Sequence, residues 1–143
     1  MSTIKTNTLT GTTSAGSINV TGEGGSTTTN LQQGLTKCMI TYNAGTADSG
    51  TDLDGVYDSF NYTSLVDRGS TGTFDLNFTN NMGNANYCVN FTGGDFSGTD
   101  DSTSVHYITN LATGSYRADC FVFSDGSGND TTYNAQQVVG DLA

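Results

Sequence analysis

The chain contains no proline and no tryptophan, and it has few positive charges. Its 143 residues include 4 Lys+Arg against 14 Asp+Glu, for a formal net charge of −10. A nucleic-acid-binding face needs clustered Lys and Arg, and an anionic membrane surface attracts the same residues. The shortage of positive charge therefore argues against binding to nucleic acid and to an anionic membrane surface.

Long apolar runs are missing as well. No stretch of about 18 apolar residues occurs, so no transmembrane helix is expected. The opening "MSTIKTNTLTGTTSAGSI" has no apolar segment of the kind found in secretory signal peptides. The cysteines Cys38, Cys88 and Cys120 are odd in number and lack CxxC spacing, which argues against a disulfide framework or a zinc site. We interpret all three as buried or half-buried thiols.

Catalytic patterns are scarce. His106 is the only histidine, Glu23 is the only glutamate, and no G-x-S-x-G motif occurs. A single histidine within a β-type segment, here "SVHYIT", is more often structural than a general base. We therefore expect no enzymatic activity, no catalytic residues and no cofactor.

Short segments of β-type composition recur from residue 35 onward. They are "LTKCMITYN" (35–43), "VYDSFNYTSL" (56–65), two runs within 72–91, "SVHYITN" (104–110), "SYRADCFVF" (115–123) and "YNAQQVVGDL" (133–142). Gly-containing linkers separate them, most with Asp as well, as is typical of turns. Seven strands at this spacing predict an all-β fold over residues 35–143, an antiparallel β-sandwich or jelly roll.

The stretch 72–91, "GTFDLNFTNNMGNANYCVNF", alternates apolar and polar residues, breaks at "TNNMGN" and alternates again. Strand side chains have a period of two, so each run should bury one face. Asn and Gly in the break tolerate positive φ, which predicts an antiparallel hairpin. Its expected core side is Phe74, Leu76, Phe78, Tyr87, Val89 and Phe91.

Residues 1–34 differ from the rest of the chain because their apolar residues are sparse. These are Ile4, Leu9, Ile18, Val20 and Leu31. So few apolar side chains do not offset the entropy of ordering such a segment. We predict an extended N-terminal arm whose strands pair outside their own chain, with "GEGGSTTTN" (22–30) as a flexible joint before the sandwich.

Three groups of acidic residues lie in Gly-containing loops and could bind a hard cation such as calcium. They are Asp48, Asp52 and Asp54; Asp95, Asp100 and Asp101; and Asp125 and Asp130. None matches the EF-hand pattern, and Asp is also an ordinary turn residue. The loops 44–55 and 92–103 are the expected recognition loops, through Asp52, Asp54, Asp95, Asp100 and Asp101.

A sugar-binding face is the other candidate site, because aromatic rings stack on sugars and Asn or Asp bind their hydroxyls. The available tyrosines are Tyr42, Tyr57, Tyr62, Tyr107, Tyr116 and Tyr133. Tyrosine on strands more often packs across neighbouring strands.

The segment "YDSFNYTSLVDRGSTGTFDLNFTNNMGNANYCVNF" (57–91) resembles small tail-fibre or appendage proteins of tailed bacteriophages that infect marine bacteria and cyanobacteria. The opening "MSTIKTNTL", the segment "NLQQGLTKCMITYNAGT" (30–46) and the closing "VVGDLA" also resemble that group. The chain departs from it at Leu35, Cys38 and Met39 and in the loops 44–55 and 92–103.

This resemblance implies a virion structural protein, assembled in the host cytoplasm and commonly trimeric. The arm would bind other virion proteins, and a host-surface glycan or protein would be a further partner. Because loops carry specificity, the resemblance does not identify the target. A capsid decoration protein or head fibre, a free carbohydrate-binding module and a polysaccharide depolymerase remain as alternatives.

Overall fold

The computed structural model describes residues 4–10, 18–21, 25, 28–50, 52–94, 104–123 and 125–142. The chain divides into two compact units, Met1–Leu35 and Thr36–Ala143. This division falls next to the boundary expected from composition. None of the helices among the described residues is long and apolar enough to span a membrane.

The N-terminal unit contains a small hairpin, in which β1 (Asn19–Thr21) pairs antiparallel with β2 (Thr28–Asn30), followed by the single helical turn α1 (Leu31–Gly34). These two strands pair with each other within the chain, and pairing of their outer edges with other chains stays a prediction. Of the predicted joint 22–30, Thr28–Asn30 form β2, and the remaining residues except Gly25 lie outside the described residues, so its role as a joint stays a prediction. Among the apolar arm residues, Ile4, Leu9 and Val20 are 88%, 60% and 51% exposed.

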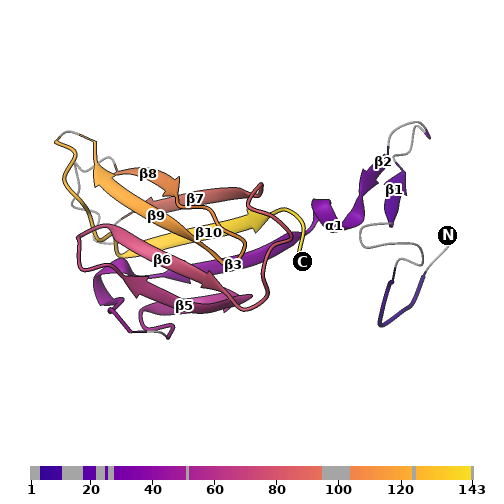
Figure 1. The fold of residues 1–143 in the computed structure, drawn as a ribbon, viewed down its shortest axis with the longest axis horizontal. Coiled ribbons are helices and arrows are strands. Elements are labelled where there is room, and N and C mark those ends of the chain that lie inside the picture. Colours follow the sequence, from indigo (N-terminus) through magenta and orange to yellow (C-terminus); the bar gives the residue numbers. More distant parts are fainter. Residues whose placement is uncertain are drawn as a thin grey trace. The chain divides into compact units, whose positions relative to one another are not determined.

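The second unit is an antiparallel β-sandwich of two four-stranded sheets, which confirms the all-β prediction (Figure 1). The first sheet has the order β4 (Val56–Phe60), β3 (Thr36–Tyr42), β10 (Tyr133–Val139), β7 (Cys88–Gly94). The second has the order β5 (Tyr62–Asp67), β6 (Thr73–Phe78), β9 (Ser115–Val122), β8 (Ser104–Thr109). The short 3₁₀ turn η1 (Ala44–Thr46) follows β3.

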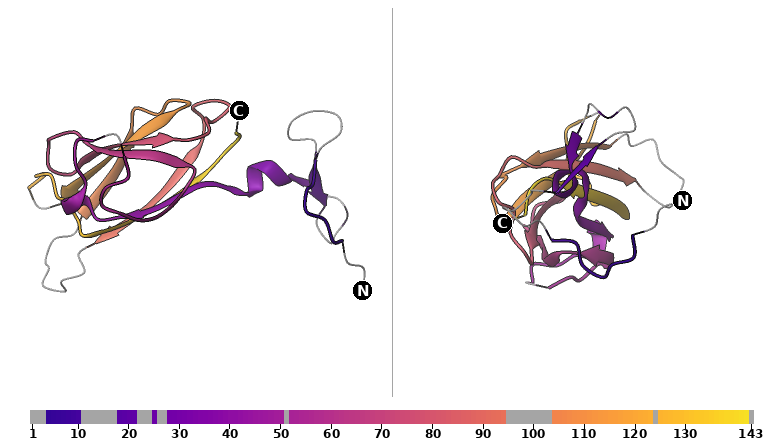
Figure 2. Two further views of the ribbon diagram at one scale, coloured as in Figure 1. Left: turned by 90° about the horizontal axis from the view of Figure 1, so that it is seen from below. Right: turned by 90° about the vertical axis from the view of Figure 1, so that its right-hand side faces the viewer.

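The two sheets share one apolar core, around which the layers curve in the further views of Figure 2. Strand alternation explains its composition, since β6 has Phe74, Leu76 and Phe78 buried between half-exposed neighbours. Burying one such side chain contributes about 2 kcal/mol to stability. Tyr87 is also buried, and Val89 and Phe91 are half-buried against the core, so all six predicted core positions face it.

The predicted 72–91 hairpin is wrong in its pairing. β6 pairs with β5 and β9 in one sheet, whereas β7 pairs with β10 in the other. The linker 79–87 therefore crosses between the sheets and is not a hairpin turn. Met82 in this linker is 1% exposed, and its N–H donates to the carbonyl of Thr113 at 2.8 Å. An apolar side chain that anchors the crossing in the core is incompatible with an exposed hairpin tip.

The predicted strand 56–65 is two strands, because the chain changes sheet at Asn61. This residue has a φ of 63°, a left-handed conformation that Asn adopts more readily than most residues. Its Oδ1 accepts from the N–H of Asn80 at 2.7 Å, and its Nδ2 donates to the Lys37 carbonyl at 3.3 Å. One carboxamide thus fixes the corner between β4 and β5, and the sandwich gains an eighth strand.

Two of the three cysteine predictions are confirmed. Cys38 and Cys120 are buried, but Cys88 is exposed, so its expected burial is wrong. Cys88 begins β7 with the parity of the exposed Asn90, which directs it outward. None of the three cysteines forms a disulfide, and burial raises the pKa of the Cys38 thiol to about 11.

Candidate functional site

The acidic loop between β3 and β4 brings three predicted residues together. Carboxylate oxygens of Asp48, Asp52 and Asp54 lie within 4.8 Å of one another, and all three residues are exposed. We call this group the acidic triad. Three carboxylates are a fraction of the six to eight oxygen ligands that calcium takes. The triad is therefore a candidate cation site by composition and proximity only.

The backbone of the same loop has a structural task. The N–H of Leu65 donates to the Asp52 carbonyl and the N–H of Asp67 donates to the Asp48 carbonyl, both at 2.7 Å. The loop thus covers the outer edge of β5, which would otherwise expose unpaired backbone groups. The side chains of Asp48 and Asp52 accept from the N–H groups of Gly50 and Asp54. These contacts explain the acidic residues as turn residues without any ion.

The other expected recognition residues, Asp95, Asp100 and Asp101, lie outside the described residues. Their role in recognition stays a prediction. Asp125 caps its own turn by accepting from the N–H and hydroxyl of Ser127, and these hydrogen bonds lower the pKa of its carboxyl.

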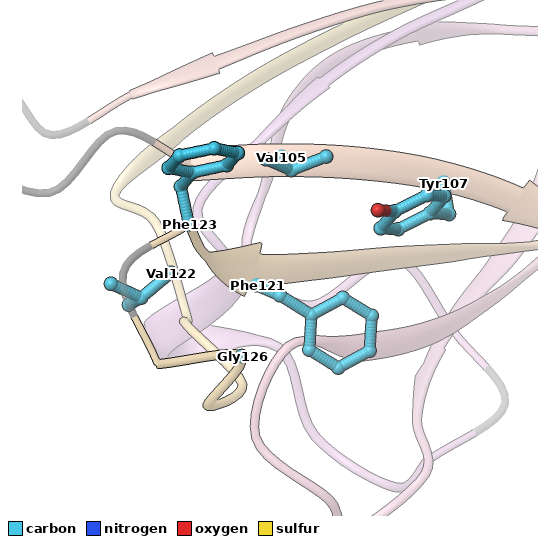
Figure 3. Close-up of a pocket in the computed structure, with 6 residues that line it drawn as sticks. All are labelled: Val105, Tyr107, Phe121, Val122, Phe123 and Gly126. Carbon is cyan, nitrogen blue, oxygen red and sulfur yellow. The ribbon is translucent and has the colours of Figure 1, made fainter.

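An apolar depression of about 350 Å³ lies at the end of β8 and β9 (Figure 3). We call it the aromatic hollow; it is lined by Val105, Tyr107, Phe121, Val122, Phe123 and Gly126. Val105 and Phe121 are direct cross-strand partners, and the rings of Tyr107 and Phe121 lie 6.0 Å apart. Phe123 is 74% exposed. Aliphatic and aromatic side chains dominate the lining, as is typical of a protein contact.

Charged side chains lie beside the hollow on the same face. The guanidinium of Arg117 donates to both carboxylate oxygens of Asp75, at 2.7 and 3.3 Å, and Arg68 lies 3.5 Å from the same carboxylate. The hydrogen bond to Asp75 raises the pKa of Arg117. Asp119 accepts from the Thr109 hydroxyl at 2.8 Å. The outer face of β5-β6-β9-β8 thus combines paired charges with an apolar end.

The outer face of β4-β3-β10-β7 is different. It has a shallow depression of about 300 Å³, the sheet trough, lined by Met39, Ile40, Thr41, Asn90, Thr92, Ala135, Gln136 and Gln137. At one side of this face Tyr57 and Tyr133 stack with ring centres 6.4 Å apart, and the Tyr57 hydroxyl donates to the Thr132 carbonyl. The lining of the trough therefore contains hydroxyl and carboxamide groups and no charged side chain, with the exposed Tyr57 at its side.

Most of the predicted sugar-binding tyrosines are elsewhere. Tyr42, Tyr62 and Tyr116 are buried, and they join the sheets through a chain of hydrogen bonds. The Tyr62 and Tyr116 hydroxyls are 2.7 Å apart, Tyr116 donates to Gln136 Oε1 at 2.5 Å, and Gln136 donates to the Tyr42 hydroxyl at 2.8 Å. Burial raises the pKa of all three tyrosines. Tyr57 and Tyr107 are exposed, and Tyr133 is half-buried.

His106 lies where β7 and β8 meet. Its ring centre is 4.1 Å from that of Phe91, and its Nδ1 is buried without a hydrogen-bond partner. Burial lowers the pKa of the imidazole, partly offset by a hydrogen bond with the backbone of Gly93. The imidazole ring of His106 therefore packs against the phenyl ring of Phe91.

No protein-family model, curated protein or solved structure matches the chain. The arguments for its function therefore rest on the sequence resemblance and on the surfaces described above.

The sequence alone predicted the acidic triad and the exposed tyrosines as candidate site residues, but not the sheet trough. The sequence feature that could have predicted the trough is the alternation along 133–139: Tyr133, Ala135 and Gln137 occupy every second position and so lie on one face of the strand.

Proposed function

We propose that the chain is a structural protein of a bacteriophage particle, a tail fibre or similar appendage, attached through its N-terminal unit. The observation that carries the proposal is the contrast between the units. The sandwich has a core of buried apolar side chains, whereas Ile4, Leu9 and Val20, in the described part of the N-terminal unit, are mostly exposed. Exposed aliphatic side chains in an arm favour contact with other chains.

Self-association is part of this proposal. With a hydrophobic content of 34%, the chain gains little from burial within one copy and more from surface buried between copies. We propose a homotrimer in which the arms contact one another and a carrier protein of the particle. Sedimentation equilibrium should then give three times 14.9 kDa at micromolar concentration, and a single species of 14.9 kDa would contradict the trimer.

The location of the protein is tested on purified particles of the virus that encodes it. The double variant Ile4→Asp/Leu9→Asp should fold, because neither side chain contributes to the sandwich core, yet it should be depleted from particles. Thr10→Asp, at an exposed polar position of the same arm, is the matched control and should be retained. Quantitative mass spectrometry gives the copy number.

Incorporation of the double variant at full copy number would show that attachment does not use the arm. Cryo-electron microscopy of the same particles separates the tail appendage from its alternative. Density at the tail supports the proposal, and density on the capsid surface would instead make the chain a decoration protein or head fibre.

A further inference from the structure

The register of the first sheet places the side chains of its outer face in rows. Thr41, Ala135 and Thr92 form one row across β3, β10 and β7, and Met39, Gln137 and Asn90 form the row two residues further along. Tyr133 lies two residues from Ala135 along β10, in the direction away from Gln137. The sheet trough is therefore lowest along the small side chains of the first row, with larger side chains on both sides.

The dimensions of the trough follow from strand geometry. Tyr133 and Gln137 are four residues apart on one strand, a backbone distance of about 14 Å, and three adjacent strands span about 10 Å. After allowance for the bordering side chains, this space admits a flat six-membered ring lying across the strands.

The chemistry of the lining narrows the ligand class. Thr41 and Thr92 provide hydroxyls, and Asn90 provides an exposed carboxamide that can donate and accept. The carboxamide of Gln137 is held by a hydrogen bond to the Thr36 hydroxyl. Tyr57, 61% exposed, adds an aromatic ring beside the trough, and the methyl and methylene groups of Met39 and Ala135 suit the C–H faces of a sugar.

Charge decides between sugar types. None of the eight residues that line the trough is charged. Beside the trough, Asp58 is the register partner of Thr41, and Lys37 of β3 is 4% exposed; both arginines bind Asp75 of the other sheet. Uronates, sialic acids and phosphorylated glycans need a positive partner that the lining of the trough does not offer. We propose that the sheet trough binds a neutral oligosaccharide, with Asn90 and Thr92 contacting its hydroxyls and Tyr57 contacting a ring face.

This inference does not depend on attachment to a particle, since it concerns one face of the isolated sandwich. It is tested with the full chain coupled to fluorescent beads and an array of immobilised neutral hexose and N-acetylhexosamine oligosaccharides, together with uronate and sialylated ones. We expect binding to a subset of the neutral probes. Removing one ligand hydrogen bond with Asn90→Ala should weaken that binding about tenfold.

A second variant fills the trough without removing a polar group. Ala135→Gln should abolish binding, while Thr63→Gln, at an exposed position of β5 in the other sheet, should leave it unchanged. Circular dichroism melts show whether each variant folds, and Tyr57→Ala provides an independent loss of binding if Ala135→Gln does not.

Four results would overturn the inference: no bound glycan, binding to acidic probes alone, unchanged binding in all three trough variants, or equal loss in Thr63→Gln. A change of sedimentation mass in Ala135→Gln would likewise assign this face to contacts between copies. The particle experiment is separate, because Ala135→Gln should be incorporated normally. A chain absent from particles that still binds neutral glycans would refute the proposed function alone.

Discussion

The two outer faces of the sandwich differ although they cover the same core. The face of β5-β6-β9-β8 has Asp75 bound by Arg117 and Arg68, with the aromatic hollow at its end. The face of β4-β3-β10-β7 has hydroxyls, carboxamides and the Tyr57–Tyr133 pair around the sheet trough. Inward positions are constrained by shared packing, so chemical differences between the sheets are concentrated in their outward positions.

The largest effect should come from breaking the core that the faces share. Leu76 is fully buried on β6, so Leu76→Asp would place an unpaired charge in an apolar interior and should abolish soluble folded protein. Leu76→Met nearly conserves volume and should cost less than about 1.5 kcal/mol. The variants are compared by expression, gel filtration and urea unfolding. A soluble, folded Leu76→Asp protein would mean that the side chain of residue 76 does not face the core.

A smaller loss should follow from cutting the hydrogen bonds that link the sheets. Tyr116→Phe removes the hydroxyl between Tyr62 and Gln136 and leaves buried polar atoms unpaired. We expect a loss of about 1–3 kcal/mol in the free energy of unfolding. Tyr107→Phe, at a 54% exposed position, is the control and should change it little. Equal stabilities in urea would show that the buried chain of hydrogen bonds is not stabilising.

Lowering the pH should reduce the free energy of unfolding through protonation of His106, which lies where β7 and β8 meet. Its folded-state pKa is lowered from 6.5, so the unfolded chain binds the proton more tightly. The neutral imidazole makes its full contribution to the free energy of unfolding above pH 6.5, and this contribution is lost as the pH falls through the folded-state pKa. The free energy of unfolding should change by at most about 1.4 kcal/mol per pH unit through this group. His106→Gln should remove this slope between pH 7 and 5. An unchanged slope would assign the titration to other groups.

The smallest expected effect on stability comes from removing one acidic side chain from each outer face and comparing the two variants. Asp75→Asn breaks the pairs with Arg117 and Arg68 and should cost at most about 1 kcal/mol, because both pairs are partly exposed. Asp58→Asn on the other face should have almost no effect. The difference between the two variants should shrink in 1 M salt, where the Debye length is about 3 Å. A difference that salt leaves unchanged would indicate packing rather than charge.

Sequence periodicity identified which side chains face the core, but not which strands pair. Phe74, Leu76 and Phe78 follow directly from alternation, because facing is a local property. The partners of β6 and β7 are set by non-local packing, and a linker containing Asn and Gly is compatible with both a hairpin and a crossing. The buried Met82 distinguishes the two cases, and its burial is visible only in three dimensions.

The same limit applies to the candidate sites. The acidic triad could be predicted because its members are close in sequence. The sheet trough combines β3, β10 and β7, so it required the strand order. The error for Cys88 was avoidable, since Asn90 shares its parity and marks that side of the strand as polar.

The pairing of β3 with β10 has a consequence for biosynthesis. Tyr42 and Gln136, which are joined by a hydrogen bond, lie 94 positions apart in sequence, and β10 also separates β3 from β7 in the centre of its sheet. During translation, β3 has left the ribosome long before β10 exists, so the edge of β3 that pairs with β10 stays without its partner. The first sheet can close only when the last strand arrives. A chain that stops before residue 133 therefore keeps an open sheet edge and is a natural target for aggregation or proteolysis.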